Sequence, residues 1–215
     1  IDLLGVDPAR VETIHLGISP AFSPLLRDPQ WLAERFAISG PVVLSVGTPE
    51  PRKNLAGTVA VFKRVLAAVP EATLLLVGGD GWGADDIGAR VAQLGARVVR
   101  TGRLEFDDLT RTYASADCFL FPSLLEGFGF PPLEAMASGT PVVCSNRPSL
   151  PEVVGAAART SDPHDIEGLA DAVIDVLSNP TTADDLRRRG LDQAARFNWQ
   201  RTVERTVAAY RQALA

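Results

Sequence analysis

The chain has 215 residues, of which 46% are hydrophobic and 22% are charged, and its formal net charge is −5. This composition is that of a globular protein, and the scattered acidic residues disfavour a nucleic-acid-binding surface. No stretch reaches the length of a membrane-spanning helix, no signal peptide is recognisable, and two cysteines with two histidines indicate neither a disulfide framework nor a metal cluster.

The first 30 residues contain few signals of regular structure. Residues 11–16 form a candidate strand, and a proline-rich stretch follows it. His15 is expected to be a surface or linker histidine. Residues 31–37 predict a short helix before the first long apolar run.

A buried strand is predicted at residues 42–46, where a short apolar run is bounded by a proline and a glycine. The turn after it contains Arg52 and Lys53, and Asn54 is placed to cap a helix over residues 55–68. Cations in such turns are usually solvated. At the carboxyl end of a buried strand, however, an arginine fork beside a lysine point charge suits a diphosphate.

Strands and helices alternate through the middle of the chain. Strands are predicted at residues 73–77 and 98–101, and helices at residues 85–94 and 109–115. The first of these strands ends in the glycine-rich run 78–83, which either makes a turn or lets the backbone approach a ligand. Tyr113, in the second helix, is expected to be a packing residue.

The most informative stretch predicts a buried strand over residues 118–121, a loop containing Gly127 and Gly129, a helix over residues 133–137 and a second strand from Val142. A loop of this kind delivers backbone N–H groups to the N-terminus of a helix. That geometry binds anions, and phosphate above all.

Two carboxylates frame this loop with seven residues between them: Glu126 opens it, and Glu134 is expected in the first turn of the helix. Because the loop separates them, they cannot share a helix face. They can flank a ligand whose phosphate rests on the loop, since carboxylates accept paired hydrogen bonds from sugar hydroxyls. The simpler alternatives are a solvated loop charge for Glu126 and a helix-dipole charge for Glu134.

The last third predicts a short helix within residues 145–154, a strand over 156–160, helices over 165–177 and 183–195, and a final helix to about residue 214. About six strands thus alternate with helices, which predicts an α/β fold: a doubly wound, Rossmann-like parallel sheet with helices on both faces. Ligands of such sheets bind outside the carboxyl ends of the strands. Those ends are expected to bring together Arg52, Lys53, Gly78, Gly79 and Glu126.

The run Glu-Gly-Phe-Gly-Phe-Pro-Pro-Leu-Glu-Ala-Met-Ala-Ser-Gly-Thr-Pro-Val-Val, residues 126–143, resembles the signature of the retaining glycosyltransferases of group 1, also called family 4. The paired glutamates match that family's E-x7-E motif. The resemblance covers nearly the whole chain and implies the C-terminal half of a two-domain GT-B enzyme. Residues 50–54, Glu-Pro-Arg-Lys-Asn, are most similar to mannosyltransferase members.

The resemblance implies a role for each candidate site residue. The implied catalytic residues are Arg52, Lys53 and Glu126. The implied donor-binding residues are Gly47, Gly78, Gly79, Arg103, Gly127, Phe128, Gly129, Phe130 and Glu134. Arg52 and Lys53 would stabilise the leaving diphosphate, Glu126 would hold sugar hydroxyls, and Glu134 would bind the ribose.

The resemblance also divides the chain. Residues 1–29 would be the interdomain connector and the start of the domain, and residues 30–195 the Rossmann-like nucleotide-sugar-binding domain. Residues 196–215 would form a C-terminal helix that reaches back to an N-terminal domain outside these residues. Because that N-terminal half supplies most of the acceptor site, this part alone is expected to be inactive.

The implied donor is a nucleotide-diphosphate sugar, with GDP-mannose as the candidate, and no metal cofactor is expected. The implied acceptor is a glycan or a lipid-linked acceptor of polysaccharide biosynthesis, bound through the N-terminal half. Cys118 and Cys144 lie in apolar strands and are expected to be buried thiols. A cytoplasmic protein is therefore expected, with peripheral contact at the inner face of the membrane through the other half.

Other nucleotide-binding classes fit less well. A nicotinamide-dependent oxidoreductase is disfavoured because no G-x-G-x-x-G follows the first strand, and a P-loop kinase because no G-x-x-x-x-G-K-[ST] is present. A non-catalytic sugar-nucleotide-binding module and a related GT-B epimerase remain as alternatives.

Overall fold

The computed structural model describes residues 5–79, 81 and 87–214, and the structural statements below refer to these residues. A single sheet of six parallel strands has the order β3-β2-β1-β4-β5-β6. The strands are β1 (Val42–Val46), β2 (Thr73–Val77), β3 (Val98–Gly102), β4 (Cys118–Phe121), β5 (Val142–Ser145) and β6 (Arg159–Ser161). The predicted doubly wound, Rossmann-like fold is confirmed.

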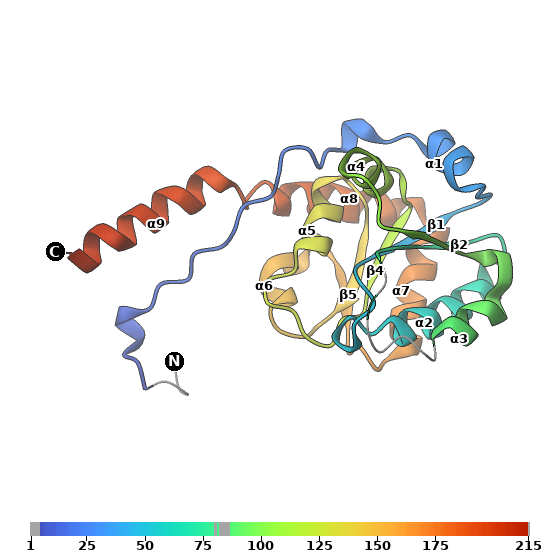
Figure 1. The fold of residues 1–215 in the computed structure, drawn as a ribbon, viewed down its shortest axis with the longest axis horizontal. Helices are drawn as coiled ribbons and strands as arrows, with labels where there is room; N and C mark the ends of the chain where they lie inside the picture. Colours follow the sequence, from blue (N-terminus) through green and yellow to red (C-terminus); the bar gives the residue numbers. More distant parts are fainter. Residues whose placement is uncertain (1–4, 80, 82–86, 215) are drawn as a thin grey trace.

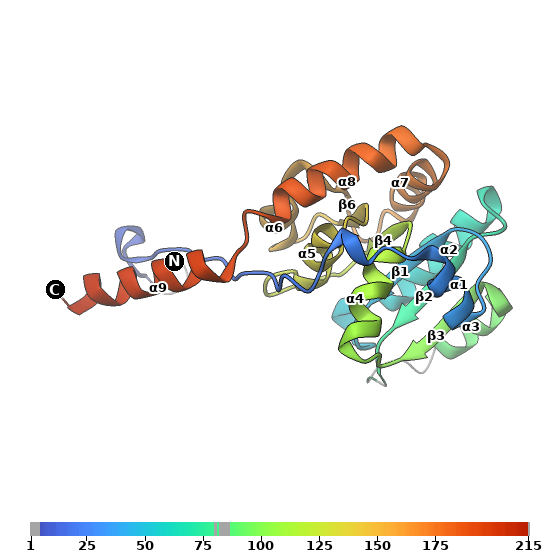
Figure 2. The ribbon, with the colours of Figure 1, turned by 90° about the horizontal axis from the view of Figure 1, so that it is seen from above.

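Helices cover both faces of the sheet (Figures 1 and 2). They are α1 (Pro29–Phe36), α2 (Leu55–Ala68), α3 (Ile87–Leu94), α4 (Phe106–Ser115), α5 (Phe130–Ala137), α6 (Leu150–Val154), α7 (Ile166–Ser178), α8 (Pro180–Ala194) and α9 (Trp199–Leu214). One face packs against α2 and α7, and the other against α1, α4 and α5. The layers follow from the four central strands, β2, β1, β4 and β5, whose sequences are apolar at most positions and which are largely buried.

Neighbouring residues of a strand belong to opposite cores. Val43 packs in the core under α2 and α7, whereas Leu44, the next residue, packs in the core under α4 and α5. Both are fully buried. Because side chains alternate across a strand, a continuous apolar run is what a sheet covered on both faces requires. Cys118 and Cys144 are free, buried thiols, as predicted, and burial raises the pKa of Cys144 to about 12.

Side-chain caps fix several helix starts. The side chain of Asn54 accepts a hydrogen bond from the Gly57 N–H at 3.1 Å, which confirms the predicted cap of α2. Asp165 caps α7 in the same way. Asn179 caps α8 with Pro180 at its first position, so this helix begins three residues before the predicted start at residue 183.

Some predicted boundaries are wrong. The candidate strand at residues 11–16 is extended but unpaired, because it runs outside the sheet. The last strand lies at Arg159–Ser161 rather than 156–160, since a short 3-10 helix occupies residues 155–157. Helix α4 begins at Phe106, three residues before the predicted start at 109. Residues 80 and 82–86 lie outside the described residues. They include part of the glycine-rich run 78–83 and the start of the helix predicted at 85–94.

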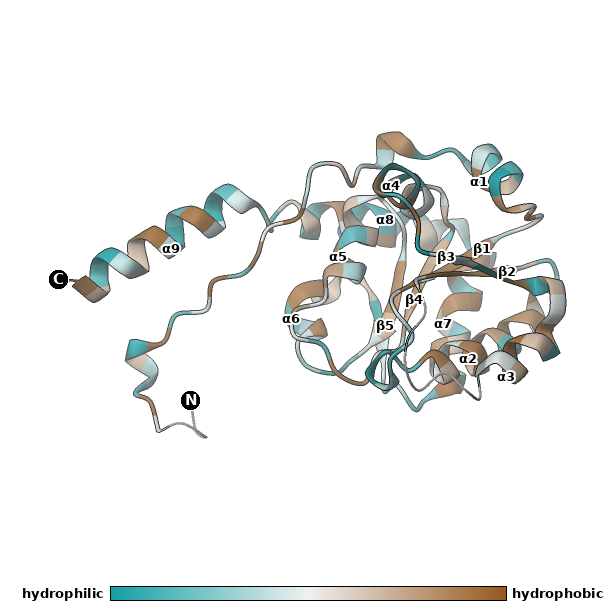
Figure 3. Cartoon of the chain, viewed as in Figure 1, coloured by the Kyte–Doolittle hydropathy of each residue, from teal (hydrophilic) through white to brown (hydrophobic). Residues whose placement is uncertain are grey.

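The last helix stands apart from the sheet. α9 extends away from the domain beside the N-terminal segment (Figures 1, 2 and 3), and none of its residues is buried. Arg205 pairs with Glu12 at 2.7 Å, and Thr202 donates to the His15 carbonyl at 2.8 Å. No described helix is both long enough and apolar enough to span a bilayer.

Candidate functional site

The site lies where β1 and β4 run side by side. The chain turns from β1 towards β2 on one side and from β4 towards β5 on the other, so the crevice between their carboxyl ends is the switch point of the sheet. A short 3-10 helix, Pro51–Lys53, follows β1, and residues 122–129 form the loop after β4. Both segments carry predicted site residues.

Hydrogen bonds join these two segments into one unit. The Arg52 carbonyl accepts from the Leu124 N–H at 2.7 Å, and the Ser123 hydroxyl oxygen lies 2.8 Å from the same carbonyl. The Asn54 side chain donates to the Pro122 carbonyl at 3.0 Å. Asn54 itself has a φ of +52°, a left-handed conformation that asparagine tolerates. The two turns are therefore fixed against each other by the protein alone.

The two predicted cations meet the first predicted carboxylate. Lys53 Nζ lies 2.8 Å from Glu126 Oε1, and Arg52 NH1 lies 3.2 Å from Glu126 Oε2. The Ser123 hydroxyl donates to Glu126 Oε1 at 2.6 Å. The side chain of Glu126 is only 7% exposed and that of Lys53 15%, whereas that of Arg52 is 43% exposed. A buried carboxylate needs such partners, because an unpaired charge there is costly.

The cluster is electrically balanced. Arg52 Nε also pairs with Glu50 Oε2 at 2.7 Å, so the charges of two cations and two carboxylates cancel. Lys53 Nζ also lies 4.8 Å from the centre of the Phe121 ring, which is a cation–π contact. An anionic ligand at this point would compete with Glu50 and Glu126 for Arg52 and Lys53.

The second predicted carboxylate lies on α5. Glu134 Oε2 accepts a hydrogen bond from the Tyr113 hydroxyl at 2.8 Å. Burial raises the pKa of Glu134, while the Tyr113 hydrogen bond and the charge of Lys53 act in the opposite direction. Lys53 thus acts electrostatically on both glutamates. The expected place in the first helical turn was wrong, because α5 begins at Phe130 and Glu134 lies in its second turn.

The loop before α5 offers main-chain donors. None of the N–H groups of residues 127–130 donates to another protein atom in the described part of the chain. Gly127 faces open space, and Gly129 has a φ of +114°, where a Cβ would lie 2.8 Å from Leu150 Cδ2. The Phe128 ring packs against the rings of Phe130, His15 and Phe197. The loop presents backbone, as predicted, while Phe128 anchors it.

A cavity of about 830 Å³ opens beside these groups, at the ends of β1, β2 and β3. Four predicted residues line it: Gly47, Gly78, Gly79 and Arg103. A Cβ on Gly78 would lie 2.2 Å from the Gly47 carbonyl oxygen, so the two turns touch and only glycine fits. Glu126, Glu134 and the 127–130 loop do not line this cavity. The predicted residues therefore fall into two groups. Arg52, Lys53 and Glu126 form a charged cluster, and the three glycines and Arg103 line the cavity beside it.

Comparison with known proteins gives the family. Residues 33–193 match the family described as glycosyl transferases group 1. The chain belongs to this family. The O-antigen chain mannosyltransferase B of Escherichia coli is 38% identical over 172 residues, which are 78% of this chain and 45% of that protein. The D-inositol 3-phosphate glycosyltransferase of Mycolicibacterium vanbaalenii is 33% identical over 238 residues, which cover 100% of this chain and 50% of that protein.

This group 1 chain spans about half the length of these two relatives. Among solved structures, Anabaena HepE in complex with UDP and glucose superposes with a TM-score of 0.83, at 20% identity over 99% of this chain and 59% of that one. At that identity the likeness supports the fold, which is the Rossmann-like half of a GT-B glycosyltransferase.

Two polar residues of the group 1 site were not predicted. Tyr113 was expected only to pack, yet its hydroxyl bonds Glu134. Ser123, between the strand and the glycine-rich loop, bonds Glu126 and is fully buried. A tyrosine in an amphipathic helix and a serine in an irregular loop three residues before Glu126 carry no sequence signal for these hydrogen bonds.

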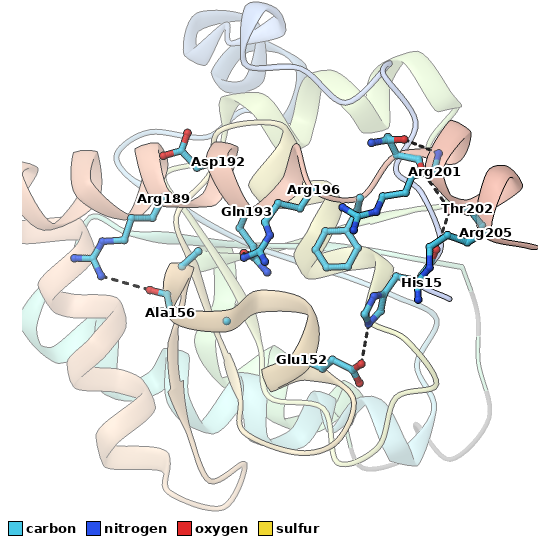
Figure 4. Close-up of a pocket in the computed structure, with 14 residues that line it drawn as sticks. His15, Glu152, Ala156, Arg189, Asp192, Gln193, Arg196, Arg201, Thr202 and Arg205 are labelled. Carbon is cyan, nitrogen blue, oxygen red and sulfur yellow. Dashed lines mark hydrogen bonds and ion pairs between the residues drawn. The ribbon is translucent and has the colours of Figure 1, made fainter. Parts of the chain in front are cut away.

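A second cavity, of about 640 Å³, shares no lining residue with the charged cluster or with the first cavity (Figure 4). It is formed by the N-terminal segment, the end of α8 and the start of α9, and it contains four arginines: Arg189, Arg196, Arg201 and Arg205. His15 lies in its wall and bonds Glu152 at 2.7 Å, so it is a part-exposed, paired residue. These four arginines make this arginine pocket a second candidate site for an anion.

Proposed function

We propose that this chain is the donor-binding half of a retaining glycosyltransferase, which moves a sugar from a nucleotide-diphosphate sugar to an acceptor. One observation carries the proposal: Arg52, Lys53 and the free amides of residues 127–130 lie together at the switch point of the sheet. Membership of the group 1 family supports the same reaction class.

The cations and amides would bind the diphosphate of the donor. Arg52 is the more exposed cation, so its guanidinium can turn from Glu126 to a phosphate oxygen while Lys53 stays in place. Helix and loop N–H groups supply further donors. As the bond between the anomeric carbon and the phosphate oxygen breaks, its electrons pass to the diphosphate. The site stabilises that developing charge with fixed donors, and no metal is required.

Glu126 would hold hydroxyls of the transferred sugar and stabilise positive charge at the anomeric carbon. Its oxygens already accept bonds from Lys53 and Ser123, which fix the carboxylate in place. The acceptor oxygen would attack on the face from which the phosphate leaves and transfer its proton to that phosphate. The configuration at the anomeric carbon is then retained.

Glu134 would accept hydrogen bonds from the ribose hydroxyls, and the cavity lined by Gly78, Gly79 and Arg103 would take the base. A cavity of about 830 Å³ is large enough for a nucleoside. GDP-mannose is the proposed donor. The mannosyltransferase named among the relatives and the form of residues 50–54 support it.

The acceptor would be a glycan or a lipid-linked saccharide, bound by a preceding half of the full-length protein. α9 supports such a half, because Val203, Tyr210 and Leu214 are exposed at 57%, 68% and 89% on a helix that has no buried residue. We place the full-length enzyme in the cytoplasm, at the inner face of the membrane.

A thermal-shift screen of nucleoside diphosphates tests the proposal. A nucleoside diphosphate at a hundred times its dissociation constant is expected to stabilise the chain by ~2.7 kcal/mol. Inorganic pyrophosphate and an Arg201→Gln variant serve as controls for the arginine pocket. If no nucleoside diphosphate raises the melting temperature, or if Arg201→Gln abolishes the shift, the proposed site is wrong.

Turnover separates an enzyme from the alternatives. The full-length protein should release nucleoside diphosphate from the sugar nucleotide when an acceptor is present. A non-catalytic module would bind the donor without release, and an epimerase would change the sugar without an acceptor.

A further inference from the structure

The position of Tyr113 is fixed by contacts of its ring and its backbone, and none of these contacts uses its hydroxyl. The residue lies in α4 and is fully buried. Its ring packs edge-on against Phe22 and at a tilt against Phe119, with centroid distances of 5.5 Å in both cases. Its backbone carbonyl accepts the hydroxyl of Thr140. The apolar contacts would be the same for a phenylalanine.

The hydroxyl of Tyr113 has one partner. It donates to Glu134 Oε2 at 2.8 Å, and no other side chain in the described residues donates to Glu134. Burial raises the pKa of Tyr113 far above its ordinary value, so the phenol remains a donor at neutral pH. Because an ionised carboxylate accepts on both oxygens, this bond occupies one oxygen and leaves Oε1 for a ligand.

We propose that Tyr113 is a positioning residue for the nucleotide, whose hydroxyl orients Glu134 so that its other oxygen receives the ribose hydroxyls. The inference rests on the proposed function, because it takes the ribose as the ligand of Glu134. It goes further by giving Tyr113, a buried residue of the neighbouring helix α4, a part in donor recognition.

The bond also sets the pH range in which Glu134 works. Two groups face its carboxyl: the phenol of Tyr113 from α4 and the ammonium of Lys53 from the turn after β1, and both lower the pKa that burial raises. When the phenol is removed, Lys53 is the remaining group that lowers the pKa of Glu134 against the effect of burial, so this pKa should rise. The variant should therefore lose nucleotide affinity at a higher pH than the wild type when the pH is lowered.

The test compares Tyr113→Phe with wild type in calorimetric titrations of the full-length protein with a ribonucleoside diphosphate and its 2′,3′-dideoxy analogue. Loss of one hydrogen bond to a charged group predicts about tenfold weaker binding of the ribonucleotide. Binding of the dideoxy analogue should change little. The acid limb of the affinity profile should move to higher pH in the variant.

Thr112→Val is the matched control, because Thr112 is buried next in sequence and its hydroxyl donates to the Asp108 carbonyl within α4. It should alter stability but not the affinity profile. Equal affinity of Tyr113→Phe and wild type for the ribonucleotide, or an equal loss for both nucleotides, would overturn the role of Tyr113 while leaving the proposed function intact. If the wild type binds neither nucleotide, the proposed function fails and this inference fails with it.

Discussion

Replacing Lys53 with alanine in the full-length protein is expected to lower kcat/KM for sugar transfer by roughly 100- to 1000-fold, the loss typical of removing one fixed donor to a developing negative charge. Lys53 is 15% exposed and held by Glu126, so its ammonium is already in place before the donor binds. The change removes that charge from the leaving diphosphate. Steady-state release of nucleoside diphosphate measures the effect.

Lys63 provides the matched control for this experiment. It is the only other lysine in the sequence and is exposed on α2, away from the switch point. Lys63→Ala should leave turnover unchanged. If Lys53→Ala turns over as fast as Lys63→Ala, Lys53 has no part in stabilising the diphosphate.

Glu134→Gln is expected to weaken binding of a nucleoside diphosphate about 10- to 100-fold, because a hydrogen bond to a charged group is worth ~1.5–3 kcal/mol. The free energy of unfolding should not fall with it. Burial raises the pKa of Glu134 above 4.5, so the ionised carboxyl costs the folded state stability. Glutamine removes that cost while keeping the shape of the side chain.

The pH dependence of this second variant has a definite sign. Because the folded-state pKa of Glu134 is raised, the folded wild type binds more protons than the unfolded chain between pH 4.5 and that pKa. Stability from this group is therefore present at low pH and lost as pH rises through the window. In urea unfolding, the free energy of unfolding of Glu134→Gln should increase relative to that of the wild type as pH rises. Calorimetry that finds equal nucleotide affinity would remove Glu134 from the site.

Much of the fold is readable from the sequence because its strands are covered on both faces. The run 118–121 is apolar throughout and 42–46 is apolar except for Ser45, and a proline or glycine follows each run. Alternation with helices then requires parallel pairing. The segment at 11–16 is only half apolar and has no place in the sheet. Its partner is α9, which a strand pattern does not predict.

Helix boundaries failed where the start depends on tertiary contacts. Helix α5 starts at Phe130, because Gly129 takes a positive φ immediately before it. Pro132, which suits a first helical turn, and the helix-forming residues after it placed the start near Leu133. That shift moved Glu134 into the second turn, where burial and Tyr113 matter more than the helix dipole.

The convergence of the predicted site follows from topology. Arg52, Lys53 and Glu126 come after β1 and β4, and adjacent parallel strands end at the same edge of a sheet. Their mutual pairing was not predicted, because the cations were assigned to phosphate and Glu126 to sugar. Without a ligand, the opposite charges bind one another. The role of Tyr113 was not predicted because its partner, Glu134, lies on another helix. Ser123 lies three residues before Glu126 in an irregular loop, where spacing does not predict which side chains meet.

A crystal structure of the full-length protein with a bound nucleoside diphosphate tests the central claim most directly. We expect phosphate oxygens ~3 Å from Lys53 Nζ and from N–H groups of residues 127–130, with the ribose on Glu134. A diphosphate bound instead in the arginine pocket, with Arg52 and Lys53 still paired to Glu126 alone, would contradict it.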